Sequence, residues 1–143
     1  MSDEEDLNKL AIKAQLLSRE GQVLQGQIDM VQGAVTDLNA TIDTLKNIKK
    51  AKEGTIVPVG SGAYISCKEV DIETILVSVG AGFILKKNVK DAVEILEGRR
   101  VQASDSLEKA QKALLSVNES LQEINARASV ITARMENVQP VKE

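Results

Sequence analysis

Two segments of the chain carry apolar residues that recur by alternating steps of three and four, the spacing of one face of a coiled-coil helix. The first segment covers residues 7–45 and the second covers residues 89–138. Only Gly21 and Arg100 interrupt the apolar positions. Each repeat gathers its apolar residues in one narrow seam, which must be covered by another helix. The pattern therefore predicts two long helices, each with one buried seam.

Capping signals set the expected limits of these helices. Ser2 and Glu5 have capping-box spacing just before the first seam residue, which predicts a helix start. A lysine-rich end suits the negative pole of the helix dipole, so we expect this helix to continue to about Lys52 and to end before Gly54. Residues 1–53 are thus assigned to an N-terminal coiled-coil helix.

The second helix has its own start and stop signals. Asn88 can cap it, with Asp91 three residues on, and we expect it to end before Pro140. Residues 88–143 are assigned to a C-terminal coiled-coil helix. Because each helix has one seam and the chain between them can turn back, an antiparallel helical hairpin is favoured over two separate coils.

The register of this hairpin is less strongly specified than its existence. In the preferred register Gly21 meets Ile124, and every small seam residue faces a larger one, as dense packing requires. A slip of one heptad also avoids contacts between small residues. It differs mainly in placing Arg100 opposite Leu38 instead of near Leu45, and it stays open as the alternative.

Between the helices the average spacing of apolar residues changes from about 3.5 to two, and a spacing of two is typical of β-strands. Glycines separate the first strand-like run from the second, and the third from the fourth. The pattern predicts two β-hairpins within residues 54–87, and the Gly-x-Gly segments are interpreted as turns because neither completes a phosphate-binding motif. The strand-like runs are residues 55–59, 63–68, 74–79 and 83–86.

The predicted hairpins carry an apolar face that four short strands and two helix ends cannot cover. Isolated hairpins are marginally stable, and unpaired strand edges invite further strands. We therefore expect this central region to be the oligomerisation region, with the missing strands supplied by other subunits. Its predicted contact residues are Val57, Val59, Ile65, Ile75, Val77, Val79, Phe83 and Leu85.

Apolar residues off the seams mark a second candidate surface. Ile12 and Leu16 lie on the outer side of the first helix near its free end, and Val130 lies near the opposing free end. Scattered exposed aliphatic residues are common, so this pattern can also have no function. The specific hypothesis is an adaptable apolar tip that these residues form together with frayed seam residues. The seam residues of this tip are Leu7, Leu10, Leu17, Ile131, Met135 and Val138.

Composition removes several classes of function. The 143 residues include one tyrosine, one phenylalanine and no tryptophan, which favours an elongated coiled coil over an ordinary globular core. The net charge of −3 lacks the basic footprint of a nucleic-acid binder, and no segment has the length of a membrane span or the pattern of a secretion signal. Histidine is absent and Cys67 is alone, so we expect no catalysis, no metal and no cofactor, in a cytoplasmic protein.

The central motifs resemble a known family. Residues 56–65 and 75–83, with their paired Val-x-Val-Gly-(Ser/Ala)-Gly segments between two coiled-coil arms, are similar to the alpha class of archaeal-type prefoldin. The resemblance implies an α+β fold, in which a long antiparallel coiled-coil hairpin carries two central β-hairpins that join an intersubunit β-barrel. It also implies a heterohexamer of two alpha and four beta subunits.

The same resemblance implies a function. Members of the family capture unfolded polypeptides at the coiled-coil tips without ATP and transfer them to a group II chaperonin. This chain is accordingly expected to be a chaperone subunit and not an enzyme. The alternative is a structural coiled-coil adaptor, or a filament-forming prefoldin-like scaffold, that captures no client protein.

Overall fold

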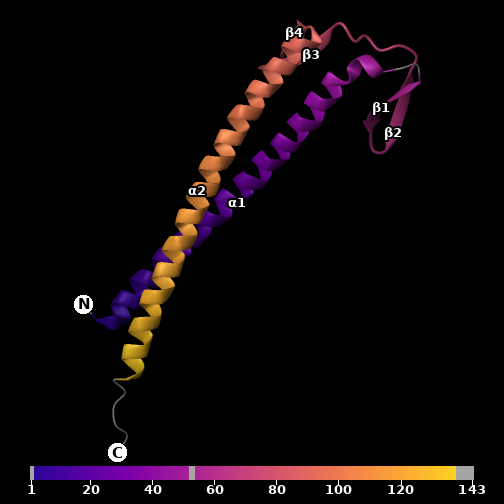
Figure 1. The fold of residues 1–143 in the computed structure, drawn as a ribbon. Helices are drawn as coiled ribbons and strands as arrows, with labels where there is room; N and C mark the ends of the chain where they lie inside the picture. Colours follow the sequence, from indigo (N-terminus) through magenta and orange to yellow (C-terminus); the bar gives the residue numbers. More distant parts are fainter. Residues whose placement is uncertain (1, 52–53, 138–143) are drawn as a thin grey trace, which may run out of the picture. The chain divides into compact units, whose positions relative to one another are not determined.

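The computed structural model describes residues 2–51 and 54–137. Two long helices flank a short 3-10 helix and four strands, so the predicted α+β fold is confirmed (Figure 1). The chain divides into two compact units, one from Met1–Gln32 and Asp105–Glu143 and the other from Gly33–Ser104. The elements are α1 (Asp3–Lys46), η1 (Ile48–Lys50), β1 (Thr55–Gly60), β2 (Ala63–Cys67), β3 (Ile75–Gly80), β4 (Phe83–Lys87) and α2 (Val89–Glu136).

Both helices start where their capping residues predict. The Ser2 hydroxyl accepts a hydrogen bond from the Glu5 backbone N–H at 3.2 Å. At the start of α2, the Asn88 side-chain oxygen accepts one from the Asp91 N–H at 2.8 Å. Each cap satisfies a backbone donor that has no partner within the helix. Helix α2 ends at Glu136, and Pro140 lies outside the described residues.

The expected continuation of the first helix to Lys52 is wrong. Helix α1 ends at Lys46, and the chain tightens into the 3-10 turn η1. The cause lies at Asn47, whose side-chain amide donates to the Asp43 carbonyl at 2.8 Å. The Asn47 N–H bonds both the Asp43 and the Thr44 carbonyls, at 3.1 and 3.2 Å, which is the shared bonding of a tightening last turn.

In the first unit, the beginning of α1 runs antiparallel to the end of α2. Arg134 pairs with the Asp3 carboxylate at 2.9 Å, which joins the first turn of α1 to the last turns of α2. Along the predicted seams, Ile28, Val117 and Ile124 are buried. The apolar repeat therefore supplies the core of this unit, as expected for a coiled coil.

The preferred register is wrong, and the structure adopts the one-heptad slip. A methyl group added at Gly21 would lie 3.5 Å from Val117 Cγ1, whereas the preferred register places Ile124, seven residues further on, opposite Gly21. In the second unit, Arg100 donates to the Asn39 side-chain oxygen at 3.0 Å, as the slip predicts by placing Arg100 near Leu38. A heptad shift moves a helix by about 10 Å, so this hydrogen bond belongs to the observed register alone.

The core of the second unit joins the helices to one hairpin. Ile42 and Leu45 of α1 pack with Val77 of β3 and with residues of the first turns of α2. Lys46 pairs with Glu97 at 3.3 Å beside this cluster. The residues contributed by α2 are Ala92, Val93 and Leu96.

Each β-hairpin is a separate two-stranded antiparallel sheet (Figure 1). Both turns have positive φ at their two central residues, 50° at Ser61 and 78° at Gly62 in the first hairpin, and 51° at Ala81 and 79° at Gly82 in the second. This is the type I′ geometry that matches the twist of paired strands. The predicted turns at both Gly-x-Gly segments are therefore confirmed. In both hairpins the register also shifts just before the turn, as in a β-bulge.

The register can be tested by disulfide cross-linking in a Cys67→Ser background. We expect the pair Gly21→Cys and Val117→Cys to form an intramolecular disulfide, because the gap at Gly21 matches the short reach of a disulfide. The matched pair Gly21→Cys and Ile124→Cys should stay reduced under the same mild oxidant. Non-reducing electrophoresis measures both. Faster cross-linking of the second pair would show that the register with Gly21 opposite Ile124 is the correct one.

Glycine in the first helix should lower its local stability. A methyl group at Gly26 would meet no atom within 4 Å, so Gly26→Ala adds helix propensity without a clash. We expect the substitution to stabilise the helix by about 1 kcal/mol, which slows amide hydrogen exchange in α1. Ala40→Gly, at an exposed position of the same helix, is the control and should accelerate exchange. Unchanged exchange in Gly26→Ala would contradict this account.

Candidate functional site: two apolar surfaces

The first candidate surface lies at the paired helix ends of the first unit. We call it the tip surface and define it by the predicted residues that the structure describes. Ile12, Leu16 and Val130 are 61%, 60% and 64% exposed, and Met135 is 40% exposed. Four seam members of the tip are half-buried, because the helices remain paired as far as Asp3 and Arg134. The half-buried residues are Leu7, Leu10, Leu17 and Ile131. Val138 lies outside the described residues.

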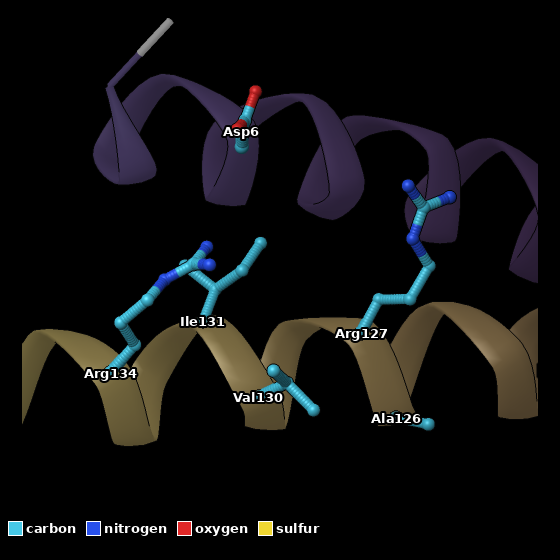
Figure 2. Close-up of a pocket in the computed structure, with 6 residues that line it drawn as sticks. All are labelled: Asp6, Ala126, Arg127, Val130, Ile131 and Arg134. Carbon is cyan, nitrogen blue, oxygen red and sulfur yellow. The ribbon is translucent and has the colours of Figure 1, made fainter.

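A hollow of about 380 Å³ lies within the tip surface. Val130, Ile131 and Ala126 give it an apolar lining, and Asp6, Arg127 and Arg134 supply charge. Figure 2 shows Arg127, Ile131 and Arg134 extending from α2 toward α1, with Ile131 between the two guanidinium groups. The tip surface therefore offers a shallow apolar contact with charged borders.

Sequence reasoning missed an extension of the tip surface along α1. Val23 and Met30 are 61% and 75% exposed. They follow Leu16 at successive intervals of seven residues, so the three side chains lie on one stripe of the helix, away from its buried seam. A search for a second heptad repeat outside the seam would have found them.

The second candidate surface is formed by the hairpins of the second unit, and we call it the hairpin surface. Of the eight predicted oligomerisation residues, Val77 is buried and Ile75 is half-buried. The others are exposed, from 38% at Val57 to 69% at Phe83. The opposite faces are also apolar, with Ile56, Tyr64, Leu76 and Ile84 each about 60% exposed. In the single chain both faces of the hairpins therefore contact water.

The two hairpins differ in how the chain holds them. Hairpin β3–β4 is anchored by Val77, and the Arg99 side chain of α2 donates to the Ser78 carbonyl. Hairpin β1–β2 has no buried residue among those described. Within the described residues, no further strand pairs with either hairpin, so each keeps free backbone edges. Of the two hairpins, β1–β2 is therefore the less well packed within the chain.

Metal-binding and membrane-spanning features are absent from the part of the chain that the structure describes. It holds no group of three or more Cys, Asp or Glu side chains arranged to bind a metal ion. None of its helices combines the length and apolar character needed to cross a membrane.

Paired coiled-coil helices with central β-hairpins define a class of coiled-coil subunit that carries hairpins. Comparison of the chain with known proteins identifies its family. The model of the prefoldin family, described as "Prefoldin subunit", matches residues 17–139. The chain belongs to the prefoldin family, whose subunits have a chaperone-type role.

Several relatives have similar length and the same description. The chain is 28% identical to "Prefoldin subunit alpha" of Pyrococcus horikoshii, over 88% of this chain and 87% of the relative. It is 30% identical to "Prefoldin subunit alpha" of Methanosarcina barkeri, over 87% of this chain and 90% of the relative. Its fold is similar to a chain of the filamentous PFD from Methanocaldococcus jannaschii, with 22% identity, a TM-score of 0.53, and coverage of 89% of this chain and 98% of that chain.

The unequal anchoring of the hairpins leads to a testable difference in stability. Val77 and Val57 occupy equivalent positions, opposite Leu85 and Ile65 respectively. Val77→Ala removes buried methyl groups and should lower the free energy of unfolding of the isolated chain by about 2 kcal/mol. Val57→Ala is the matched control and should change it by less than about 0.5 kcal/mol. Denaturant titration measures both, and equal losses would show that both hairpins are anchored alike.

Proposed function

We propose that the chain is the alpha-class subunit of a cytoplasmic, ATP-independent chaperone, and that the tip surface captures unfolded polypeptides for transfer to a group II chaperonin. The observation that carries this proposal is the exposure of Ile12, Leu16 and Val130 beside the paired helix ends. Unfolded polypeptides expose apolar side chains, and burying these against the tip surface is favourable in water. Capture by contact requires no catalytic step, so the proposal includes neither an enzyme activity nor a cofactor.

Weak contact at one tip is compatible with useful affinity if several tips act together. The tip surface is shallow, and its hollow of about 380 Å³ has room for few side chains. Linking several such surfaces in one particle makes the later contacts intramolecular, which raises the overall affinity without a deep pocket. Assembly of subunits is therefore part of the proposed mechanism.

The hairpin surface would provide that assembly. We propose a heterohexamer with beta-class prefoldin subunits, two alpha and four beta, in which the hairpins join an intersubunit β-barrel. The residues that support it are exposed apolar side chains on both hairpin faces, such as Val59, Phe83 and Ile84. A barrel removes the free strand edges and covers the apolar face together. Under this proposal, residues 54–87 act in oligomerisation, and helices α1 and α2, which lie within the flanking residues 1–53 and 88–143, form the coiled-coil arm.

A structural scaffold is the second candidate function. The stripe of Leu16, Val23 and Met30 recurs every seven residues, a spacing that also suits another helix packed along α1. In a filament-forming scaffold such a neighbour would cover the stripe, and no client protein would bind. The two functions differ in whether the tip surface stays available after assembly.

Aggregation of a chemically denatured protein, followed by light scattering, tests client capture. The complex with beta-class subunits should suppress aggregation, and Ile12→Ser, Leu16→Ser and Val130→Ser combined should lower the suppression severalfold. Each substitution removes apolar contact area from the tip surface. Size-exclusion chromatography with light scattering must show that the variant complex keeps the mass of the wild type.

A matched control separates client capture from general loss of apolar surface. Val101 and Leu115 are 59% and 60% exposed, close to the tip residues, but belong to neither candidate surface. Val101→Ser with Leu115→Ser should leave suppression near the wild-type level. If the tip variant retains full suppression in an intact complex, capture at the tip is wrong and the scaffold function is favoured.

A further inference from the structure

The charges around the hollow in the tip surface are unevenly paired. Arg134 is held by the Asp3 carboxylate at 2.9 Å. Arg127 lines the same hollow, but among the residues that the structure describes its guanidinium group has no hydrogen-bond or ion-pair partner. Asp6 also lines the hollow and offsets part of the positive charge. A guanidinium group without a carboxylate partner is thus placed beside an apolar contact surface.

From this arrangement we infer that the hollow recognises unfolded segments in which large apolar residues are flanked by carboxylates. This inference rests on the proposed function and specifies which segments the tip surface prefers. Arg127 can form paired hydrogen bonds with a carboxylate, as guanidinium groups do, while Val130 and Ile131 contact the neighbouring apolar side chain. Basic segments would meet repulsion from Arg127 and bind less well.

The spacing of the two arginines gives the preferred segment a length. Arg127 and Arg134 are separated by two helical turns and extend from the same side of α2 (Figure 2). Seven residues of helix span about 10 Å, which an extended peptide covers in about three residues. A four-residue segment with an acidic residue at each end of its apolar pair therefore spans this distance and can present a carboxylate to Arg127 in either chain direction. Because Asp3 already engages Arg134, the contact with Arg127 contributes most of the preference.

Three fluorescent peptides test the preference against the full chain by fluorescence anisotropy. They share neutral flanks and carry Glu-Leu-Phe-Glu, Gln-Leu-Phe-Gln or Lys-Leu-Phe-Lys. The acidic peptide should bind about fivefold more tightly than the neutral one, since exposed ion pairs contribute modestly, and the basic peptide should bind least. Raising the salt concentration from 0.05 to 0.5 M should remove most of the difference.

Substitutions at the hollow should change the preference in opposite directions. Arg127→Gln should bring the acidic peptide to the affinity of the neutral one, because the unpaired guanidinium is lost. Asp6→Asn should strengthen binding of the acidic peptide, because a repelling carboxylate is removed. Arg19→Gln removes the same charge from an exposed position of α1 outside the hollow, and it should keep the wild-type preference.

The outcomes separate this inference from the proposed function. If the wild-type complex suppresses aggregation but its chain binds the three peptides equally, the inference is overturned and client capture stands. If the acidic preference is present and depends on Arg127 but aggregation is not suppressed, the proposed recognition of acidic segments by the hollow is supported and client capture is wrong. If Arg127→Gln changes the mass of the particle and not peptide affinity, another subunit occupies the hollow and the inference is overturned.

Discussion

Each long helix of this chain has one narrow apolar seam, and covering that seam is the constraint on which the rest of the structure depends. A seam of one residue every three or four positions is too narrow to form a globular core, so the helices pair and little else can be buried. Ile28, Val117 and Ile124 are inside the first unit, while other aliphatic side chains of similar size remain in water. Exposed apolar surface is therefore a direct result of the architecture, and both candidate surfaces arise from it.

The register of the two helices is not fixed by apolar packing alone, and a polar interaction distinguishes the observed alignment from the alternative. Two alignments one heptad apart avoid placing small seam residues against each other. The observed alignment fits Val117 beside Gly21 and gives Arg100 a hydrogen-bond partner in Asn39. A charged residue at a seam position lowers stability relative to leucine but makes one alignment distinct from its neighbours. Arg100 is in this respect a marker of alignment within the seam.

Much of the fold could be predicted from the sequence because it is encoded locally. The period of seven, the caps at Ser2 and Asn88, and the Gly-x-Gly turns each depend on neighbouring residues. Register and the end of α1 depend on interactions that a pattern does not reveal, namely the Arg100 to Asn39 contact and the side-chain bond of Asn47. For the candidate site, individual exposed residues could be named, but the Asp3 to Arg134 pair and the hollow beside it needed the structure.

The two hairpins share the same turn and bulge, but they differ in how they pack against their own chain. Hairpin β3–β4 is fitted to Ile42, Ala92 and Arg99 of its own chain, whereas no described residue of hairpin β1–β2 is buried. Mutations in the second hairpin can be compensated by changes within the same gene. Mutations of the exposed apolar side chains in the first hairpin can be compensated by whatever covers them, so if that is another subunit, the two genes must change together. Two hairpins of the same design are then subject to different selection, internal for β3–β4 and shared between proteins for β1–β2.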